Sequence, residues 1–305
     1  MTSTIRHSLH QKALRILTAT LMCTATATSF ANADSFKKPD ILVLGDSQIT
    51  FGSGPAFLDF FQNIKQNCSP NKKQLRDLEK LGAQSVAVIG VRSTSLHSWT
   101  ARSGKPKGSV CDVDPTWKVN AGSYGTVAKK NAKNVFIQIG QGKQYQFCKK
   151  GLSPFEAMFK DNYYDPKLLV LSFLGNSSGT WAKSKSAAVT DVKATIKHLP
   201  KDTPCIFMTT APAYKKKVND DRLRAQKNIK AAFAETGNRC TFVEGLTPQS
   251  IAANLGNKKH FRLKKSGAVK DPFHPNKRAA RKFFKIEKQN ICNAIFEQVA
   301  LSTKS

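Results

Sequence analysis

Five continuous apolar runs of strand length constrain the fold of this 305-residue chain most strongly. They lie at 41–44 (ILVL), 85–89 (SVAVI), 168–174 (LLVLSFL), 205–210 (CIFMTT) and 240–243 (CTFV). Runs that are apolar throughout, rather than at every second residue, are typical of strands buried on both faces, as in a parallel sheet covered by helices.

Helices are expected between and after these runs, at 55–66, 186–198, 221–236 and 276–300. The alternation of strands and helices predicts an α/β fold, a three-layer α/β/α sandwich around a mainly parallel five-stranded sheet of the flavodoxin-like kind. One run departs from this pattern, because 134–139 (NVFIQI) alternates in polarity. It predicts an extra strand or hairpin within an insertion at about 100–160.

The first 33 residues have the pattern of a secretory signal peptide. Three basic residues precede an apolar and small-residue stretch at 16–31, which ends at the cleavage pattern Ala31-Asn32-Ala33. We therefore expect an exported protein, periplasmic or secreted, whose mature chain starts near Asp34. No later segment approaches the length of a transmembrane helix.

The mature chain, 34–305, is expected to form a single domain with a strongly basic surface. Removing the signal takes away three basic and no acidic residues, so the formal net charge falls from +29 to +26. Such an excess favours acidic partners, either an anionic polysaccharide or the anionic envelope surface. A specific nucleic-acid partner is not expected, because export separates the protein from nucleic acid and no zinc-finger, RRM or basic-zipper pattern is present.

Six cysteines remain after the signal, and an even number in an exported chain favours disulfides. The sequence does not choose among their pairings. No Cys-x-x-Cys pattern or Cys/His cluster occurs, so no zinc site is expected. These cysteines are at positions 68, 111, 148, 205, 240 and 292.

Three aromatic residues within or beside the insertion have two possible roles. Trp99, Trp117 and Tyr124 lie near a Gly- and Pro-punctuated basic loop. Their flat faces suit stacking on sugar rings, and packing in the core is an equal alternative.

A serine that follows the first strand, Ser47, raises the question of which base would activate it, because a hydroxyl needs a neighbouring base to become a nucleophile. Four histidines lie beyond the signal. His198 is expected at a helix end as a partner of the helix dipole, and His260 in a solvated basic loop. His97 follows the second strand and stays a candidate.

The fourth histidine, His274, stands in "VKDPFHPN" three residues after Asp271. In a single turn this spacing lets a carboxylate orient one imidazole nitrogen and leaves the other for a serine. The alternative is a proline-rich turn in which His274 caps the next helix.

Taken together, Gly45-Asp46-Ser47 after the first strand and Asp271-x-x-His274 before the last helix resemble the motifs of the SGNH or GDSL hydrolase family. The resemblance implies a catalytic triad of Ser47, His274 and Asp271. It implies two-step acyl transfer that needs no metal and no organic cofactor.

The resemblance also implies an oxyanion hole built from the backbone N–H of Ser47, a glycine after the second strand and an asparagine after the third. In "LSFLGNSSG" the asparagine is Asn176, although the usual Gly-x-Asn-Asp is here Leu-Gly-Asn-Ser. The glycine is assigned to Gly90, and an alternative register gives this role to Ser93.

The function expected from these features is an exported serine esterase that hydrolyses acyl esters, O-acetyl esters above all, on a carbohydrate. Two alternatives stay open. One is a polysaccharide O-acetyltransferase, and the other is a non-catalytic basic protein that binds glycans or the envelope on a degenerate scaffold of this family.

Overall fold

The computed structural model describes residues 39–81, 85–102, 108–113, 121–125, 149, 151–160 and 164–302. The expected signal peptide, the expected strand at 134–139 and the side chains of Trp117 and Tyr124 lie outside this description.

A six-stranded sheet forms the middle layer, in the order β3-β2-β1-β4-β5-β6. Five strands are parallel, and β3, at one edge, runs antiparallel to β2. The chain starts in the middle of the sheet, adds β2 on one side and then β4, β5 and β6 on the other. This order is the flavodoxin-like one, and it leaves a switch point between β1 and β4. The strands are β1 (Ile41–Gly45), β2 (Val86–Val91), β3 (Ala121–Gly125), β4 (Leu168–Ser172), β5 (Cys205–Met208) and β6 (Thr241–Val243).

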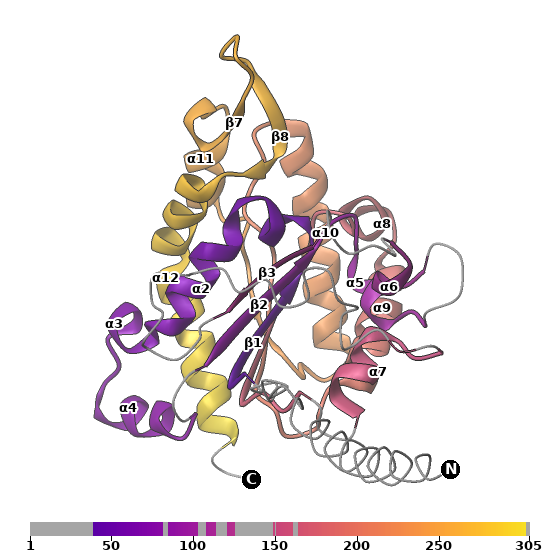
Figure 1. Cartoon of the computed structure of the whole chain (residues 1–305), viewed down its shortest axis with the longest axis vertical. Helices are drawn as coiled ribbons and strands as arrows, with labels where there is room; N and C mark the ends of the chain where they lie inside the picture. Colours follow the sequence, from indigo (N-terminus) through magenta and orange to yellow (C-terminus); the bar gives the residue numbers. More distant parts are fainter. Residues whose placement is uncertain are drawn as a thin grey trace, which may run out of the picture. The chain divides into compact units, whose positions relative to one another are not determined.

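Two groups of helices cover the two faces of the sheet (Figure 1). One group packs around α12 and consists of α2 (Gly54–Gln62), α3 (Ile64–Cys68), α4 (Lys72–Glu79), α11 (Pro248–Asn254) and α12 (Lys277–Ser302). The other consists of α5 (Leu96–Thr100), α7 (Pro154–Phe159), α8 (Ser178–Lys183), α9 (Lys185–His198) and α10 (Lys216–Glu235). The predicted three-layer α/β/α fold is therefore confirmed.

Shorter elements complete the described structure. They are the π-helical turn η1 (Ile49–Ser53), the helix α6 (Val110–Val113), the 3-10 turn η4 (Lys258–His260) and a hairpin of β7 (Phe261–Leu263) and β8 (Val269–Pro275). Figure 1 shows this hairpin projecting at one end of the sheet.

Burial on both faces explains why the strand sequences are continuously apolar. Ile41 and Val43 pack into the cluster that contains side chains of α2 and α12. Leu42 and Leu44 point to the other face and are equally inaccessible to solvent. Each of these four apolar side chains of β1 therefore contributes roughly 1.5–3 kcal/mol through its burial.

The expected helices agree with the structure, except that one is divided in two and another begins earlier than expected. The predicted segment 55–66 is divided at Asn63, whose backbone is not helical. The segment 221–236 begins five residues earlier, at Lys216, because the polar first turn of α10 carries no apolar periodicity. Trp99 is completely buried against Phe155 and Phe173, so for this residue core packing is correct and sugar stacking is not.

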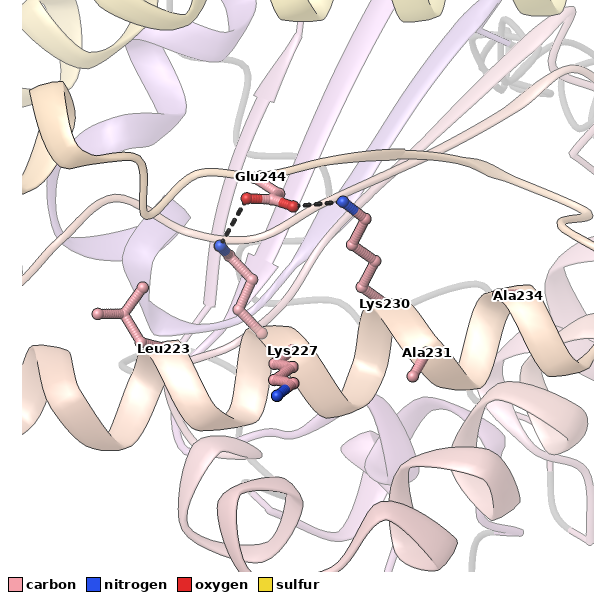
Figure 2. Close-up of a pocket in the computed structure, with 7 residues that line it drawn as sticks. Leu223, Lys227, Lys230, Ala231, Ala234 and Glu244 are labelled. Carbon is pink, nitrogen blue, oxygen red and sulfur yellow. Dashed lines mark hydrogen bonds and ion pairs between the residues drawn. The ribbon is translucent and has the colours of Figure 1, made fainter.

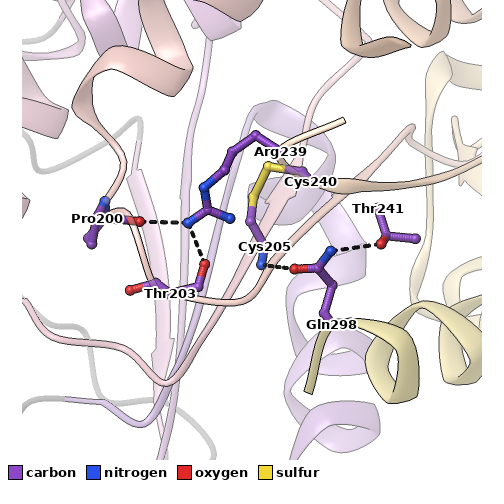
Figure 3. The surroundings of a disulfide bond; sticks show 7 residues. All are labelled: Pro200, Thr203, Cys205, Arg239, Cys240, Thr241 and Gln298. Carbon is purple, nitrogen blue, oxygen red and sulfur yellow. Dashed lines mark hydrogen bonds between the residues drawn. A yellow bond between two sulfur atoms is a disulfide. The ribbon is translucent and has the colours of Figure 1, made fainter. Parts of the chain in front are cut away.

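Two disulfides join cysteine pairs of the described structure. Cys68, at the end of α3, is bonded to Cys292 in α12, and Cys205 in β5 is bonded to Cys240. Figure 3 shows the polar surroundings of the second bond. There Arg239 donates to the carbonyls of Pro200 and Thr203, and Gln298 connects the backbone of Cys205 to Thr241. Cys111 is also disulfide-bonded.

The described helices include none with both the length and the apolar character needed to cross a membrane.

Removing the Cys68–Cys292 bond is expected to destabilise the protein more than removing Cys205–Cys240. The sequence separations are 224 and 35 residues, and the loop-entropy model then gives a difference of about 1–2 kcal/mol in the free energy of unfolding. Urea unfolding of the two double Cys→Ser variants measures it. Equal losses would show that native-state packing, rather than chain entropy, sets the contribution of each bond.

Candidate active site

The site lies at the carboxyl end of β1, beside the switch point of the sheet. Gly45 and Gly90 are neighbours in register on β1 and β2, and the side chain of Ile49 rests on both. A Cβ atom added at Gly45 would lie 2.6 Å from Ile49 Cδ1, and one added at Gly90 would lie 2.5 Å from Ile49 Cβ. The two glycines thus let the turn that follows Ser47 pack directly on the sheet.

Ser47, His274 and Asp271 are joined by two hydrogen bonds. Ser47 Oγ lies 2.8 Å from His274 Nε2, although the residues are 227 positions apart in sequence. His274 Nδ1 lies 2.9 Å from Asp271 Oδ2. The serine is almost fully buried, whereas the side chains of His274 and Asp271 are 20% and 15% exposed. The three side chains therefore have the order of hydrogen bonds that a nucleophile, a base and an orienting carboxylate require.

A bulge in the β7–β8 hairpin carries His274. Phe261 is paired with Pro275 and Arg262 with Asp271, so 272–274 are extra residues on β8. Asp271 Oδ1 accepts hydrogen bonds from the backbone N–H groups of Phe273 (3.0 Å) and His274 (3.2 Å). One carboxylate therefore fixes both the backbone of the bulge and the imidazole ring.

Hydrogen bonds from outside the hairpin hold the same bulge. Tyr214 N–H donates to the carbonyl of Pro272 at 2.9 Å. The carbonyl of Phe273 accepts from Gln48 Nε2 at 2.8 Å and from Arg222 Nη2 at 3.3 Å. Gln48, which stands where the family name GDSL has Leu, thus connects the segment of the nucleophile to the segment of the base. Nothing in the local sequence around Gln48 indicates this contact.

The charge on Asp271 is stabilised in place. Burial alone would raise the pKa of Asp271, but the neighbouring His274 and the hydrogen bonds from the backbone of Phe273 and His274 outweigh it, and the pKa lies below its usual value. Asp271 is therefore ionised over the neutral pH range, as an orienting carboxylate must be.

A second carboxylate, Asp46, lies under the site and is 1% exposed. It accepts hydrogen bonds from the backbone N–H groups of Gln48 (2.9 Å), Leu174 (3.3 Å) and Gly175 (2.9 Å). Burial raises the pKa of Asp46, while these bonds and the charge of Arg222 act in the opposite direction. Burial also lowers the pKa of Arg222 to about 10, against the favourable charges of Asp46 and Asp271. The two buried charges compensate each other in part.

Gly90 and Ser93, the two residues considered for the second oxyanion donor, have different surroundings. Gly90 lies inside β2, and its Cα faces Ile49 and the carbonyl of Asp46. Ser93, three residues on, stands in the turn after the strand with φ of 60°, in the left-handed region that favours glycine. Because Ser93 lies beyond the strand ladder, we use its backbone N–H as the second donor in the function proposed below.

Asn176 lies after β4, where the sequence predicted it. Its Nδ2 donates to the carbonyl of Thr94 at 2.9 Å, which connects the turn after β4 to the turn after β2. An amide nitrogen carries two hydrogens, so this bond orients the group and leaves one donor for a ligand.

The other three histidines do not contact the Ser47 hydroxyl. His97 is exposed on α5 and lies 3.4 Å from Asp191, whose hydrogen bond raises the pKa of His97. His198 ends α9, as expected. The expectation of a solvated loop for His260 was wrong, because its ring is buried and Nδ1 lies 2.7 Å from Asn254 Oδ1.

A hollow on α10 shares no residue with this site. Figure 2 shows Glu244 in contact with Lys230 there, and Gln226 also donates to Glu244. The apolar residues of its lining are Leu223, Ala231 and Ala234. Among the described residues, no three His, Cys, Asp or Glu side chains are grouped to bind a metal.

No family model and no curated protein matches the chain. Among solved structures it is similar to a family two carbohydrate esterase from Cellvibrio japonicus, with 15% identity and a TM-score of 0.40 over 86% of this chain and 63% of that one. It is also similar to a family two carbohydrate esterase from Clostridium thermocellum in complex with cellohexaose, with 12% identity and a TM-score of 0.39 over 84% of this chain and 65% of that one. A lipase from a goat rumen metagenome is similar with 10% identity and a TM-score of 0.38 over 83% of this chain and 97% of that one. The chain thus spans less than two thirds of either esterase. Likeness at this level carries no conclusion about activity, which depends on the geometry of the site.

Replacing Arg222 with Met is expected to lower the free energy of unfolding by roughly 3–5 kcal/mol, because it leaves the carbonyls of Ala211 and Phe273 without this donor and removes the buried charge that partly offsets Asp46. Urea unfolding measures the loss. Arg224→Met on the same helix is the matched control, since Arg224 is 61% exposed and its ion pair among the described residues is with Asp221 at the surface. We expect a change within about 1 kcal/mol. Similar losses in both variants would contradict the role given to Arg222.

Proposed function

We propose that this protein is an exported serine esterase that hydrolyses acyl esters, O-acetyl esters above all, on a carbohydrate. The observation that carries the proposal is the pair of hydrogen bonds, 2.8 Å and 2.9 Å long, that joins Ser47 to His274 and His274 to Asp271. A polar turn without a chemical role would not require a serine, a histidine and a carboxylate in this order.

In the first half-reaction, His274 Nε2 removes the proton of Ser47 as Oγ attacks the ester carbonyl. The C–O bond to the sugar then breaks, and the imidazolium returns its proton to the departing sugar oxygen. Asp271 holds the ring in the tautomer that leaves Nε2 free to accept, and it stabilises the imidazolium. The acetyl group is now bonded to Ser47.

In the second half-reaction, water gives a proton to His274 and attacks the acyl-enzyme, which releases acetate and restores Ser47. In both halves the negative oxygen would be bound by the N–H groups of Ser47 and Ser93 and by Asn176 Nδ2. Each such donor contributes roughly 3 kcal/mol to the stability of the transition state.

Two alternatives use the same scaffold. A sugar hydroxyl in place of water in the second half-reaction would make the protein a polysaccharide O-acetyltransferase. A protein that binds anionic glycans or envelope without chemistry would not need the ordered triad, so the geometry favours the enzyme.

Ser47→Ala is expected to reduce kcat for 4-nitrophenyl acetate by about 10,000-fold, because the nucleophile is lost. Release of 4-nitrophenolate by the purified mature chain measures it. Hydrolysis that persists in this variant would overturn the assignment of Ser47. A wild-type protein that does not hydrolyse the ester but moves acetyl groups to an added glycan would instead indicate the transferase.

His274→Gln is expected to cause a loss of similar size, whereas His97→Gln should leave kcat within about twofold of the wild type. The two substitutions are chemically identical, and His97 pairs with Asp191 on α5. A larger loss of kcat in His97→Gln than in His274→Gln would show that His97, and not His274, is the base.

A further inference from the structure

Phe51 lies between the proposed base and two arginines. Its ring centroid is 4.4 Å from that of His274. On the same ring, Arg92 Cζ lies 4.1 Å from the centroid and Arg262 Cζ lies 5.9 Å from it. Both guanidinium groups are within the distance of a cation–π interaction.

The two arginines reach this position from different elements. Arg92 follows β2 and directly precedes Ser93, the proposed oxyanion donor. Arg262 lies on β7, opposite Asp271, and is exposed. Two positive charges from separate parts of the chain thus converge beside the reacting side chains.

The nearby carboxylates are engaged elsewhere. Asp271 holds His274 and the backbone of the bulge, and Asp46 is buried beneath three N–H donors. No carboxylate of the described residues forms an ion pair with Arg262. The Arg262 guanidinium, packed against a ring, keeps its in-plane N–H groups for a carboxylate or another anion.

The hairpin that carries Arg262 projects at one end of the sheet (Figure 1) and is itself strongly basic. Between residues 258 and 275 the only acidic residue is Asp271. The same stretch has five exposed lysines, Lys258, Lys259, Lys264, Lys265 and Lys270. A long anionic molecule, rather than a single small anion, suits a surface of this extent.

Phe273 indicates what kind of anionic molecule fits. It is 47% exposed and adjacent to His274 in the bulge. An exposed aromatic ring beside the reacting centre can pack on the face of a sugar ring, as a linear glycan would require.

We propose that Arg262, beside the positive charge of Arg92, binds a carboxylate next to the scissile ester, so that the substrate is an acetylated acidic polysaccharide, a polymer of uronic acids. This inference rests on the proposed esterase function and specifies its substrate class. The lysines of the hairpin add contacts to carboxylates further along the polymer.

The test compares acetate release from chemically acetylated polygalacturonate and from acetylated mannan, which is neutral. The wild type should show a kcat/KM at least about tenfold higher on the polyuronate in low salt, and this preference should fall as salt screens the charges. Arg262→Gln and Arg92→Gln should each lower kcat/KM on the polyuronate about tenfold more than on the mannan.

Arg76→Gln is the matched control, because it removes the same charge from the exposed face of α4, which Figure 1 places far from the hairpin. It should leave the ratio of the two substrates unchanged. Binding of unacetylated polygalacturonate to the Ser47→Ala protein, measured by calorimetry, should weaken with Arg262→Gln and not with Arg76→Gln.

Equal rates on the two polymers, or equal effects of Arg262→Gln and Arg76→Gln, would overturn the inference while Ser47-dependent hydrolysis of 4-nitrophenyl acetate upheld the esterase. Hydrolysis of phosphatidylglycerol vesicles without release of acetate from the polyuronate would also overturn it and indicate an anionic lipid. If the protein released no acetate from either polymer and showed no Ser47-dependent hydrolysis of any ester, the esterase function and the inference would both be refuted.

Discussion

The buried carboxylate of Asp46 is the interaction on which the arrangement of the site depends. It accepts N–H groups from the turn after β1 and from the turn after β4, and so joins the two sides of the switch point. Ser47 and Gln48 follow it directly, and Asn176 follows Gly175, one of its donors. The buried Asp46 side chain therefore positions Ser47, Gln48 and Asn176. The same burial makes ionisation of Asp46 costly, and Arg222 offsets part of that cost.

Arg222 and Gln48 extend this control to the other end of the chain. Both donate to the carbonyl of Phe273, which lies in the bulge that carries His274. The distance between nucleophile and base is thus set by hydrogen bonds to backbone, which are less adjustable than contacts between long side chains. A site that must hold its reacting groups within a few tenths of an ångström benefits from this rigidity.

The sequence predicted the features that depend on local pattern. The buried strands appear as apolar runs because helices cover both faces, and Ser47, Asp271 and His274 stand in short motifs at the ends of elements. Features that depend on packing between distant segments were missed. Arg222 and Arg224 look alike in a polar stretch of α10, and only the tertiary structure buries the first and exposes the second. Gly90 seemed the better oxyanion residue because it is a glycine, yet the left-handed turn belongs to Ser93. His260 seemed solvated among lysines, but its ring is buried and hydrogen-bonded to Asn254.

The Cys68–Cys292 bond has a consequence for the resistance of the protein to cleavage by a protease. Ser47 precedes the first of these cysteines, and the bond reaches α12, the helix that directly follows the segment of His274. Cleavage of any single peptide bond between residues 68 and 292 leaves both fragments covalently attached through sulfur. A nicked molecule would therefore keep its nucleophile and its base on one covalent body, and the effective concentration of one fragment at the other would stay high enough for the native contacts to persist.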